Sequence, residues 1–130
     1  SSMAHVPAEL LYTKSHEWVQ FTGETTARVG ITDFAQNSLG DIVFVNLPAE
    51  GDGVTAGEAA CDVESVKAVA DIVSPVTGTI SAANNDLESA PEKLNESPYE
   101  AWIFEVSDIS DREELLDAAA YEAFYATEEA

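Results

Sequence analysis

Lys67 is the residue whose position most clearly suggests chemistry. It lies in the stretch 62–70, Asp-Val-Glu-Ser-Val-Lys-Ala-Val-Ala, between two runs in which apolar and polar residues alternate. Such alternation is typical of β-strands, and two runs about a short turn predict a hairpin. We therefore expect strands over 59–64 and 68–73, with residues 65–67 at the tip and the Lys67 amine in solvent.

A tip lysine of this kind suits acylation by another enzyme. The chain has three lysines against 25 acidic residues, so a lysine at a turn is an uncommon feature here. A solvated amine is protonated at neutral pH and is a poor nucleophile, which argues against a catalytic lysine. Once acylated from an activated donor, it holds a tethered reactant at high effective concentration beside a docked partner. Lys67 is thus predicted to serve a carrier whose difficult chemistry belongs to an attached cofactor.

Other catalytic and metal-binding patterns are absent from the sequence. His5 and His16 are the two histidines, and neither is spaced with a second ligand as in zinc sites. No glycine-rich loop opens a helix, and no serine stands in a Gly-x-Ser-x-Gly elbow. We therefore expect no metal site and no catalysis by this chain alone.

A hairpin and a short helix are predicted ahead of the lysine hairpin. Strand-forming residues over 18–21 and 25–31 flank a turn and predict two antiparallel strands. Thr32 is a residue type that caps helices, and Gly40 is a residue type favoured just after them. A helix is therefore predicted over 33–39.

The remaining elements complete a mostly β fold. The continuous apolar run 42–45 predicts a buried strand, and 101–106 predicts a last strand. Ser110 and Glu113 have the spacing of a capping box, which predicts a C-terminal helix starting there. The expected fold class is a barrel-sandwich hybrid of two antiparallel sheets, with short peripheral helices and a C-terminal helix.

Composition limits the classes of partner and compartment. The 130 residues suit a single domain over 1–130, in which Ser1 and Ser2 ahead of Met3 resemble a cloning scar. A net charge of −20 argues against nucleic acid and anionic membranes as partners. Cys61 is the one cysteine, which excludes an internal disulfide and favours a cytoplasmic location. No apolar run is long enough to span a membrane.

Between about Leu11 and about Tyr121 the chain resembles the glycine cleavage system H-proteins, whose lipoyl-lysine site has a Glu-Ser-Val-Lys-Ala core. Each motif is weak alone, but their order and spacing are highly specific. The segments that carry the resemblance are His16-Glu17-Trp18, Gly30-Ile31-Thr32-Asp33 with Ala35-Gln36, Leu39-Gly40-Asp41 with Val43-Phe44-Val45, Leu47-Pro48, Glu64-Ser65-Val66-Lys67-Ala68, Ser74-Pro75-Val76 with Gly78, and Asn95 with Pro98-Tyr99.

The resemblance implies a non-catalytic lipoylated carrier, expected to be monomeric. Lys67 would carry lipoate in amide linkage, within an attachment motif made of Glu64, Ser65, Val66 and Ala68. The partners would be a pyridoxal-phosphate-dependent glycine decarboxylase (P-protein), a tetrahydrofolate-dependent aminomethyltransferase (T-protein), dihydrolipoyl dehydrogenase (L-protein) and a lipoate-attaching enzyme. The carrier would shuttle the aminomethyl group of glycine between the first two, and the third would reoxidise it.

The resemblance also implies a cleft that shelters the arm. Glu17 matches the family's cleft glutamate, which can pair with the aminomethyl ammonium. Phe34 replaces a histidine that many members have in the cleft, so it offers apolar packing and no hydrogen bond. The segment Pro98-Tyr99-Glu100-Ala101-Trp102 is one residue shorter than the usual family pattern and lacks its glycine.

Other carrier families share a lysine at a hairpin tip. Biotin carriers place their lysine between methionines, whereas Val66 and Ala68 flank Lys67 here. Lipoyl domains of 2-oxoacid dehydrogenases usually read Asp-Lys-Ala and lack the N-terminal hairpin and C-terminal helix. An H-like protein that relays lipoate to other enzymes fits the same residues and stays open. From another class, an acidic interaction module would function without Lys67.

Overall fold

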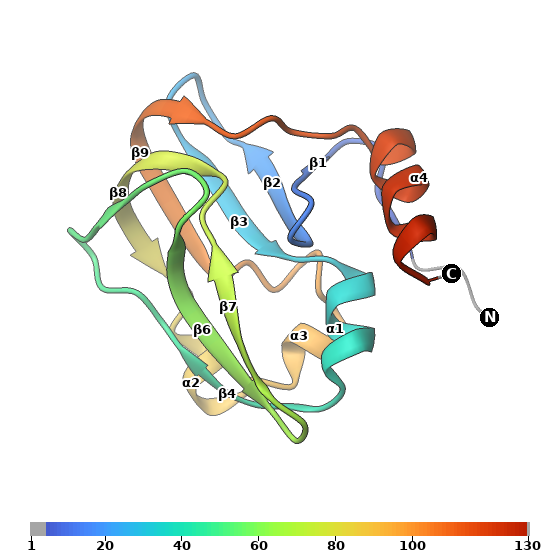
Figure 1. The fold of residues 1–130 in the computed structure, drawn as a ribbon. Coiled ribbons are helices and arrows are strands. Elements are labelled where there is room, and N and C mark those ends of the chain that lie inside the picture. The colour runs from blue at the N-terminus through green and yellow to red at the C-terminus, as the bar shows by residue number, and fades with distance from the viewer. Residues whose placement is uncertain (1–4, 130) are drawn as a thin grey trace.

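The computed structural model describes residues 5–129, which form two antiparallel sheets and four helices (Figure 1). The larger sheet has the strand order β1-β2-β3-β9-β8-β5, and the smaller has the order β4-β6-β7. The strands are β1 (Leu11–Tyr12), β2 (Glu17–Phe21), β3 (Ala27–Ile31), β4 (Ile42–Asn46), β5 (Gly53–Val54), β6 (Ala59–Ser65), β7 (Val69–Val73), β8 (Val76–Ala83) and β9 (Phe104–Arg112). The helices are α1 (Asp33–Leu39), α2 (Asp86–Ser89), α3 (Lys93–Glu96) and α4 (Ala118–Glu129). The expected fold class is confirmed.

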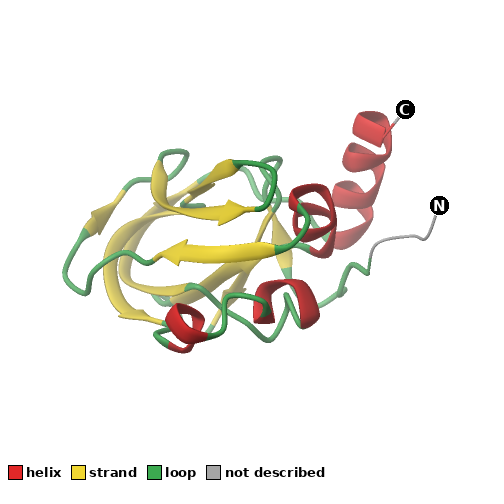
Figure 2. Cartoon of the chain, turned by 90° about the horizontal axis from the view of Figure 1, so that it is seen from below, coloured by secondary structure: helices red, strands yellow, loops and turns green. Residues whose placement is uncertain are grey.

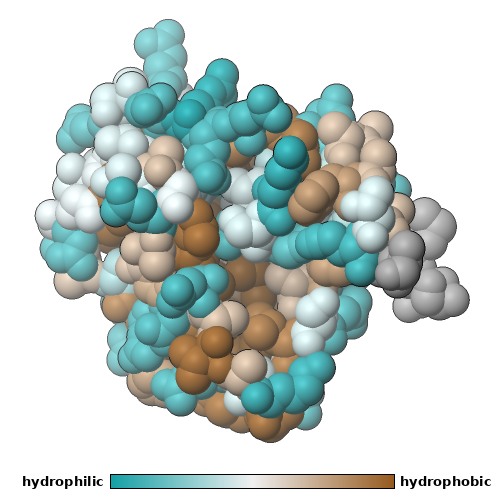
Figure 3. Space-filling view, viewed as in Figure 1, coloured by the Kyte–Doolittle hydropathy of each residue, from teal (hydrophilic) through white to brown (hydrophobic). Residues whose placement is uncertain are grey.

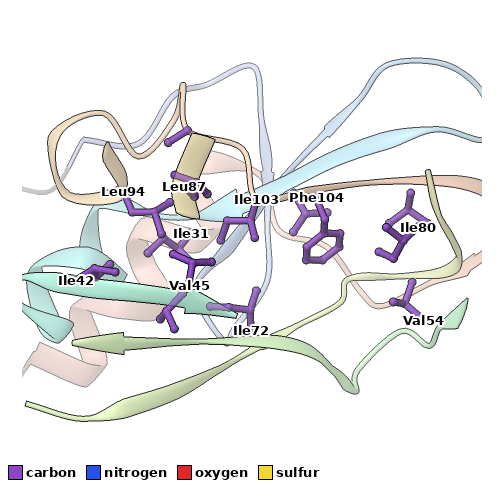
Figure 4. Close-up of a cluster of buried hydrophobic side chains, with 14 of the residues drawn as sticks. Ile31, Ile42, Val45, Val54, Ile72, Ile80, Leu87, Leu94, Ile103 and Phe104 are labelled. Carbon is purple, nitrogen blue, oxygen red and sulfur yellow. The ribbon is translucent and has the colours of Figure 1, made fainter. Parts of the chain in front are cut away.

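The core lies between the two sheets. Val45 and Ile72 of the small sheet face Ile31, Ile103 and neighbouring side chains on the other side (Figure 4). The short helices α2 and α3 each bury one leucine at an end of this core. Burying apolar area from both sheets stabilises the sandwich and holds β6 and β7 from their inner face, leaving the hairpin between them free to project.

A second, aromatic cluster joins α4 to the larger sheet. Tyr12 of β1 stacks on Tyr121 of α4, with ring centroids 4.8 Å apart. Trp18 of β2 is buried in the same cluster, and its indole N–H donates to the Pro98 carbonyl over 2.9 Å. Both cartoons place α4 beside the sandwich rather than over either sheet (Figures 1 and 2). The helix therefore contacts the body mainly through aromatic rings.

The local signals around α1 and the lysine hairpin predicted the structure well. Thr32 caps α1, its hydroxyl accepting the Ala35 N–H over 3.2 Å, and Gly40 follows the helix with a φ of +76°. The hairpin expected over 59–64 and 68–73 is β6 and β7, with Ser65 inside the strand rather than in the turn. The hairpin expected over 18–21 and 25–31 is β2 and β3.

The expected capping box at Ser110 and Glu113 is wrong. Residues 110–112 belong to β9, because Thr77 and Val76 of β8 pair with Asp111 and Arg112. Pairing across the sheet thus overrides a local helix signal. The helix begins at Ala118 instead, where the Asp117 carboxylate accepts the Ala120 N–H over 2.8 Å.

Two strand expectations need correction as well. The last strand, expected over 101–106, runs from Phe104 to Arg112, because the turn after Ser97 extends to Trp102 before pairing begins. The run 42–45 is a strand, but Val43 and Phe44 are exposed where a β-bulge shifts its register with β6. A bulge turns side chains away from the core, which the apolar sequence alone does not reveal.

Candidate functional site

The turn that presents Lys67 is fixed by Ser65. The Ser65 hydroxyl oxygen accepts the N–H groups of Lys67 and Ala68, each over 3.1 Å. The Ser65 N–H donates to the Ala68 carbonyl over 2.8 Å, and the Val66 N–H donates to the Asp41 carbonyl over 3.0 Å. Lys67 is exposed at this tip. The backbone is therefore held in place while the side chain remains accessible to a modifying enzyme.

The outer part of the Lys67 side chain lies beside the end of α1. A methyl group added to Gly40 would lie 3.6 Å from Lys67 Cε and 3.9 Å from Val66 Cγ2. Leu39, the last residue of α1, borders a cavity on the same side of the molecule. The lysine stem is thus next to the helix that walls this cavity.

A cavity of about 190 Å³ lies between the edge strand β7 and the elements β2, β3 and α1. In the space-filling view, apolar surface is visible in the hollow between the β6–β7 hairpin and α1 (Figure 3). Apolar side chains supply half of the lining residues, and the polar ones come from residues 15–17, from α1 and from β7. The lining residues are Ser15, His16, Glu17, Ile31, Ala35, Ser38, Leu39, Ala70, Asp71 and Ile72.

Glu17 is the buried charged group of this cavity, with 1% of its surface exposed. Thr13 and Ser15 donate their hydroxyls to Oε1 over 2.6 and 2.5 Å, and the Val73 N–H donates to Oε2 over 3.2 Å. Burial raises the pKa of the Glu17 carboxyl from 4.5 to about 7, although these hydrogen bonds oppose the rise. None of the ion pairs among residues 5–129 involves Glu17. A cation entering the cavity would stabilise the ionised carboxylate.

Phe34 lies behind the cavity wall and is not a lining residue. Its ring stacks on His16 at a centroid distance of 4.6 Å and contacts Tyr125 at 4.9 Å. His16 does line the cavity. Phe34 therefore supports the wall through His16 rather than facing the space directly.

The structure brings the expected residues into two places. Glu64, Ser65, Val66, Lys67 and Ala68 form the hairpin end, whereas Glu17 lies in the cavity. Other residues that line the cavity had no role predicted from the sequence. They include Ser15, His16, Ala35, Ser38 and Asp71, of which His16 and Ala35 lie within the motifs that carry the resemblance. These residues lie around one cavity because β7 passes close to β2 and α1, and no local sequence pattern indicates that arrangement.

Exposed apolar side chains gather around Lys67. Among residues 5–129, the large hydrophobic side chains that are well exposed are Val43, Phe44, Val66 and Val69. Phe44, Glu64 and Val69 are register partners across β4, β6 and β7, so they share one face of the small sheet. This group of four, the tip patch, adjoins the lysine.

Three larger hollows lie elsewhere, one of them of about 510 Å³ beside Phe21 and Arg112. A second, of about 560 Å³, is lined mostly by polar and charged side chains that include Lys14, Glu113 and Glu114. The third, of about 380 Å³, lies beside His5 and Tyr99. None of the three includes a residue of the hairpin tip, so proximity to Lys67 favours the smaller cavity as the functional one.

Comparison with known proteins identifies a family. The family model described as "Glycine cleavage H-protein" matches residues 10–128. A glycine cleavage system H protein of Lachnoclostridium phytofermentans is 57% identical, with 88% of this chain and 91% of that protein covered. One of Acidobacterium capsulatum is 54% identical over 91% and 92%. The crystal structure of a glycine cleavage system H protein from Mycobacterium marinum matches with a TM-score of 0.87 and 37% identity, covering 93% of this chain and 99% of that one.

The residues present fit a lipoyl group. The exposed amine of Lys67 can form the amide, and Ile31, Leu39 and Ile72 offer apolar contacts to an alkyl arm. At the polar side of the cavity, Glu17 offers a buried carboxylate to a cation. The chain thus belongs to the glycine cleavage H-protein family, the non-catalytic lipoyl carriers of the glycine cleavage system.

Proposed function

We propose that Lys67 is the lipoylated residue of this carrier and that the cavity ending at Glu17 shelters its arm. The observation that supports this most strongly is the cavity beside the lysine, which is apolar along much of its wall and holds a buried carboxylate that forms no ion pair within residues 5–129. When bound, lipoate supplies the thiol–disulfide chemistry that lets one arm accept both an aminomethyl group and electrons.

In this proposal the residues of the chain position the lipoyl arm and protect the group attached to it. Ser65 fixes the turn, so the arm pivots from a defined point. The apolar wall excludes water from the attached group, which slows its hydrolysis. Glu17 holds the ammonium end by charge and by its fixed orientation between Thr13, Ser15 and Val73. Asp71, exposed on the same cavity, adds a second carboxylate where the cation enters.

The burial of Glu17 also distinguishes two candidate functions, the aminomethyl shuttle and the relay of lipoate. A protein that only relays lipoate to other enzymes has no ammonium to bind and no need of a buried carboxylate that lacks an ion pair within residues 5–129. Burying such a group costs free energy unless a partner compensates. The aminomethyl shuttle between glycine decarboxylase and aminomethyltransferase is therefore favoured over lipoate relay. We extend the proposal to reoxidation by dihydrolipoyl dehydrogenase, a monomeric carrier and a cytoplasmic location. Within residues 5–129, no helix is long and apolar enough to cross a membrane.

The loading reaction tests this choice. The lipoylated chain is incubated with glycine and glycine decarboxylase, and release of carbon dioxide is measured together with the mass of the modified peptide. The aminomethyl proposal expects loading of the wild type, weaker loading or retention in Glu17→Gln, and none in Lys67→Arg. A chain that accepts lipoate but not the aminomethyl group would be a relay instead.

The tip patch suits the enzyme that attaches lipoate. That enzyme must surround Lys67, and the patch offers it apolar contacts next to Asp41 and Glu64, which favour basic groups on the partner. Phe44→Ser is expected to lower the rate of lipoylation about three- to tenfold by removing one exposed apolar contact. Ala59→Ser, exposed at the far end of β6, is the matched control. Equal initial rates for both variants would exclude this docking face.

A further inference from the structure

One buried hydroxyl lies between two walls of the cavity. The Tyr121 hydroxyl is 2.7 Å from His16 Nδ1 and 2.7 Å from Thr32 Oγ1. Tyr121 has no exposed surface and belongs to α4, more than 80 residues further along the chain. Tyr121 does not line the cavity itself, but from α4, which lies beside the sandwich (Figure 1), it contacts residues of both walls.

The two partners of this hydroxyl control different walls. His16 lines the cavity itself, between the lining residues Ser15 and Glu17. Thr32 caps α1, which contributes Ala35, Ser38 and Leu39 to the opposite side, so its position sets where that helix begins. A backbone hydrogen bond joins the two walls, with the Thr32 N–H donating to the His16 carbonyl over 3.1 Å. Tyr121 adds the side-chain connection.

The hydrogen bonds form a consistent chain of donors. If Thr32 donates to Tyr121 and Tyr121 donates to His16 Nδ1, the proton on Nε2 points to Glu128, which lies 2.9 Å away. Burial raises the pKa of Tyr121 far above its usual range, so the hydroxyl keeps its proton. In this series, each donor then faces an acceptor, from Thr32 through Tyr121 and His16 to Glu128.

His16 needs such support because its backbone is unusual. Its φ is +74°, a left-handed value that costs free energy for any residue with a side chain. Tyr121 and Glu128 hold its ring from α4, and Phe34 stacks on the ring face. Because His16 precedes Glu17, its conformation directs the Glu17 carboxyl into the cavity.

We propose that Tyr121 is a positioning residue for the arm cavity: its hydroxyl joins His16 to Thr32 and so keeps the Glu17 wall and the α1 wall at the spacing that shelters the arm. The inference rests on the proposed role of this cavity. It assigns α4 a function in retention of the attached group, in addition to covering the aromatic cluster.

The first test uses the unlipoylated protein and is independent of loading. Tyr121→Phe removes the hydroxyl and keeps the ring. Tyr12→Phe is the matched control, because it removes a buried hydroxyl that donates to the Pro7 carbonyl and lies outside the cavity. We expect hydrogen exchange at the amides of Glu17 and Ala35 to rise about three- to tenfold in Tyr121→Phe relative to Tyr12→Phe at matched stability.

The second test uses the lipoylated proteins carrying the aminomethyl group. Hydrolysis consumes one water, releases formaldehyde and ammonium, and returns the thiol. Ammonium release without aminomethyltransferase should be about three- to tenfold faster in Tyr121→Phe than in wild type, and unchanged in Tyr12→Phe. Glu128→Ala, a change on an exposed residue that spares the core, should give a smaller increase in the same direction.

The outcomes separate this inference from the proposed function. If Glu17→Gln accelerates release but Tyr121→Phe behaves like Tyr12→Phe in both tests, the positioning role is wrong and the cavity role stands. If neither Glu17→Gln nor Tyr121→Phe changes release, the cavity does not shelter the arm and both are overturned. Faster release in Tyr121→Phe and, to a smaller extent, in Glu128→Ala, together with faster exchange in Tyr121→Phe and no change in Tyr12→Phe, would support the inference.

Discussion

At the scale of single residues, Glu17 is a buried carboxyl group that forms no ion pair with any residue the structure describes. Its place in the His16-Glu17-Trp18 motif singled it out among 25 acids, but no local pattern indicated its burial. That burial depends on β7, since the Val73 N–H approaches from 56 residues away. Lys67 and Thr32 were predictable in the same chain because turn and cap signals are local.

Glu17→Gln should change how stability depends on pH. The folded pKa of about 7 exceeds the ordinary 4.5, so the folded state binds the proton more tightly than the unfolded state. The proton on Glu17 therefore contributes its full stabilisation below pH 4.5. This stabilisation is lost as pH rises toward about 7. The loss is on the order of 2–3 kcal/mol, and the variant should escape it.

Denaturant unfolding at about pH 5 and about pH 8 measures this difference, with exposed Glu24→Gln as control for general charge effects. We expect Glu17→Gln to gain free energy of unfolding relative to the control as pH rises. Parallel pH profiles for the two variants would contradict a raised pKa at Glu17.

Gly40 matters at the scale of elements, because it joins α1 to β4 beside the lysine. Its φ of +76° and ψ of −160° belong to a region that is almost exclusive to glycine. Gly40→Ala should lower the free energy of unfolding by about 1–3 kcal/mol, even though the new methyl meets Lys67 only at ordinary contact distance. Gly53→Ala, where nothing lies within 4 Å and φ is not positive, is the control and should be nearly neutral. Equal midpoints for the two variants would show that the backbone at Gly40 relaxes freely.

Elements defined by local signals were predicted better than elements defined by pairing. The helix at Asp33–Leu39 followed from its two ends, and the lysine hairpin followed from alternation on both sides of a turn. The capping box at Ser110 failed because β8 recruits Arg112 into the sheet. The resemblance implied a cleft at Glu17, but most residues that line the cavity could not be predicted from local patterns, since it forms only where β7 passes α1.

The charge of −20 acts on the whole molecule. Ion pairs among the described residues are few, and each involves at least one partly exposed partner. Mutual repulsion of the unpaired acids therefore opposes the compact state, and salt screens it over a Debye length of about 10 Å at 0.1 M. We expect the midpoint of thermal unfolding to rise steadily with sodium chloride. A midpoint that falls with added salt would mean that attractive pairs dominate instead.

The position of lipoylation tests the account most directly. The unmodified chain is incubated with lipoate, ATP and a lipoate ligase, then measured by intact mass and peptide mapping beside Lys67→Arg. Lys14 lies over the Phe124 ring and Lys93 is 3.9 Å from the Asp86 carboxylate, so both are amines outside the hairpin tip. We predict one lipoyl group, on Lys67, and none on the variant. No modification of the folded protein, or modification shared with Lys14 and Lys93, would contradict the assignment of Lys67 as the carrier lysine.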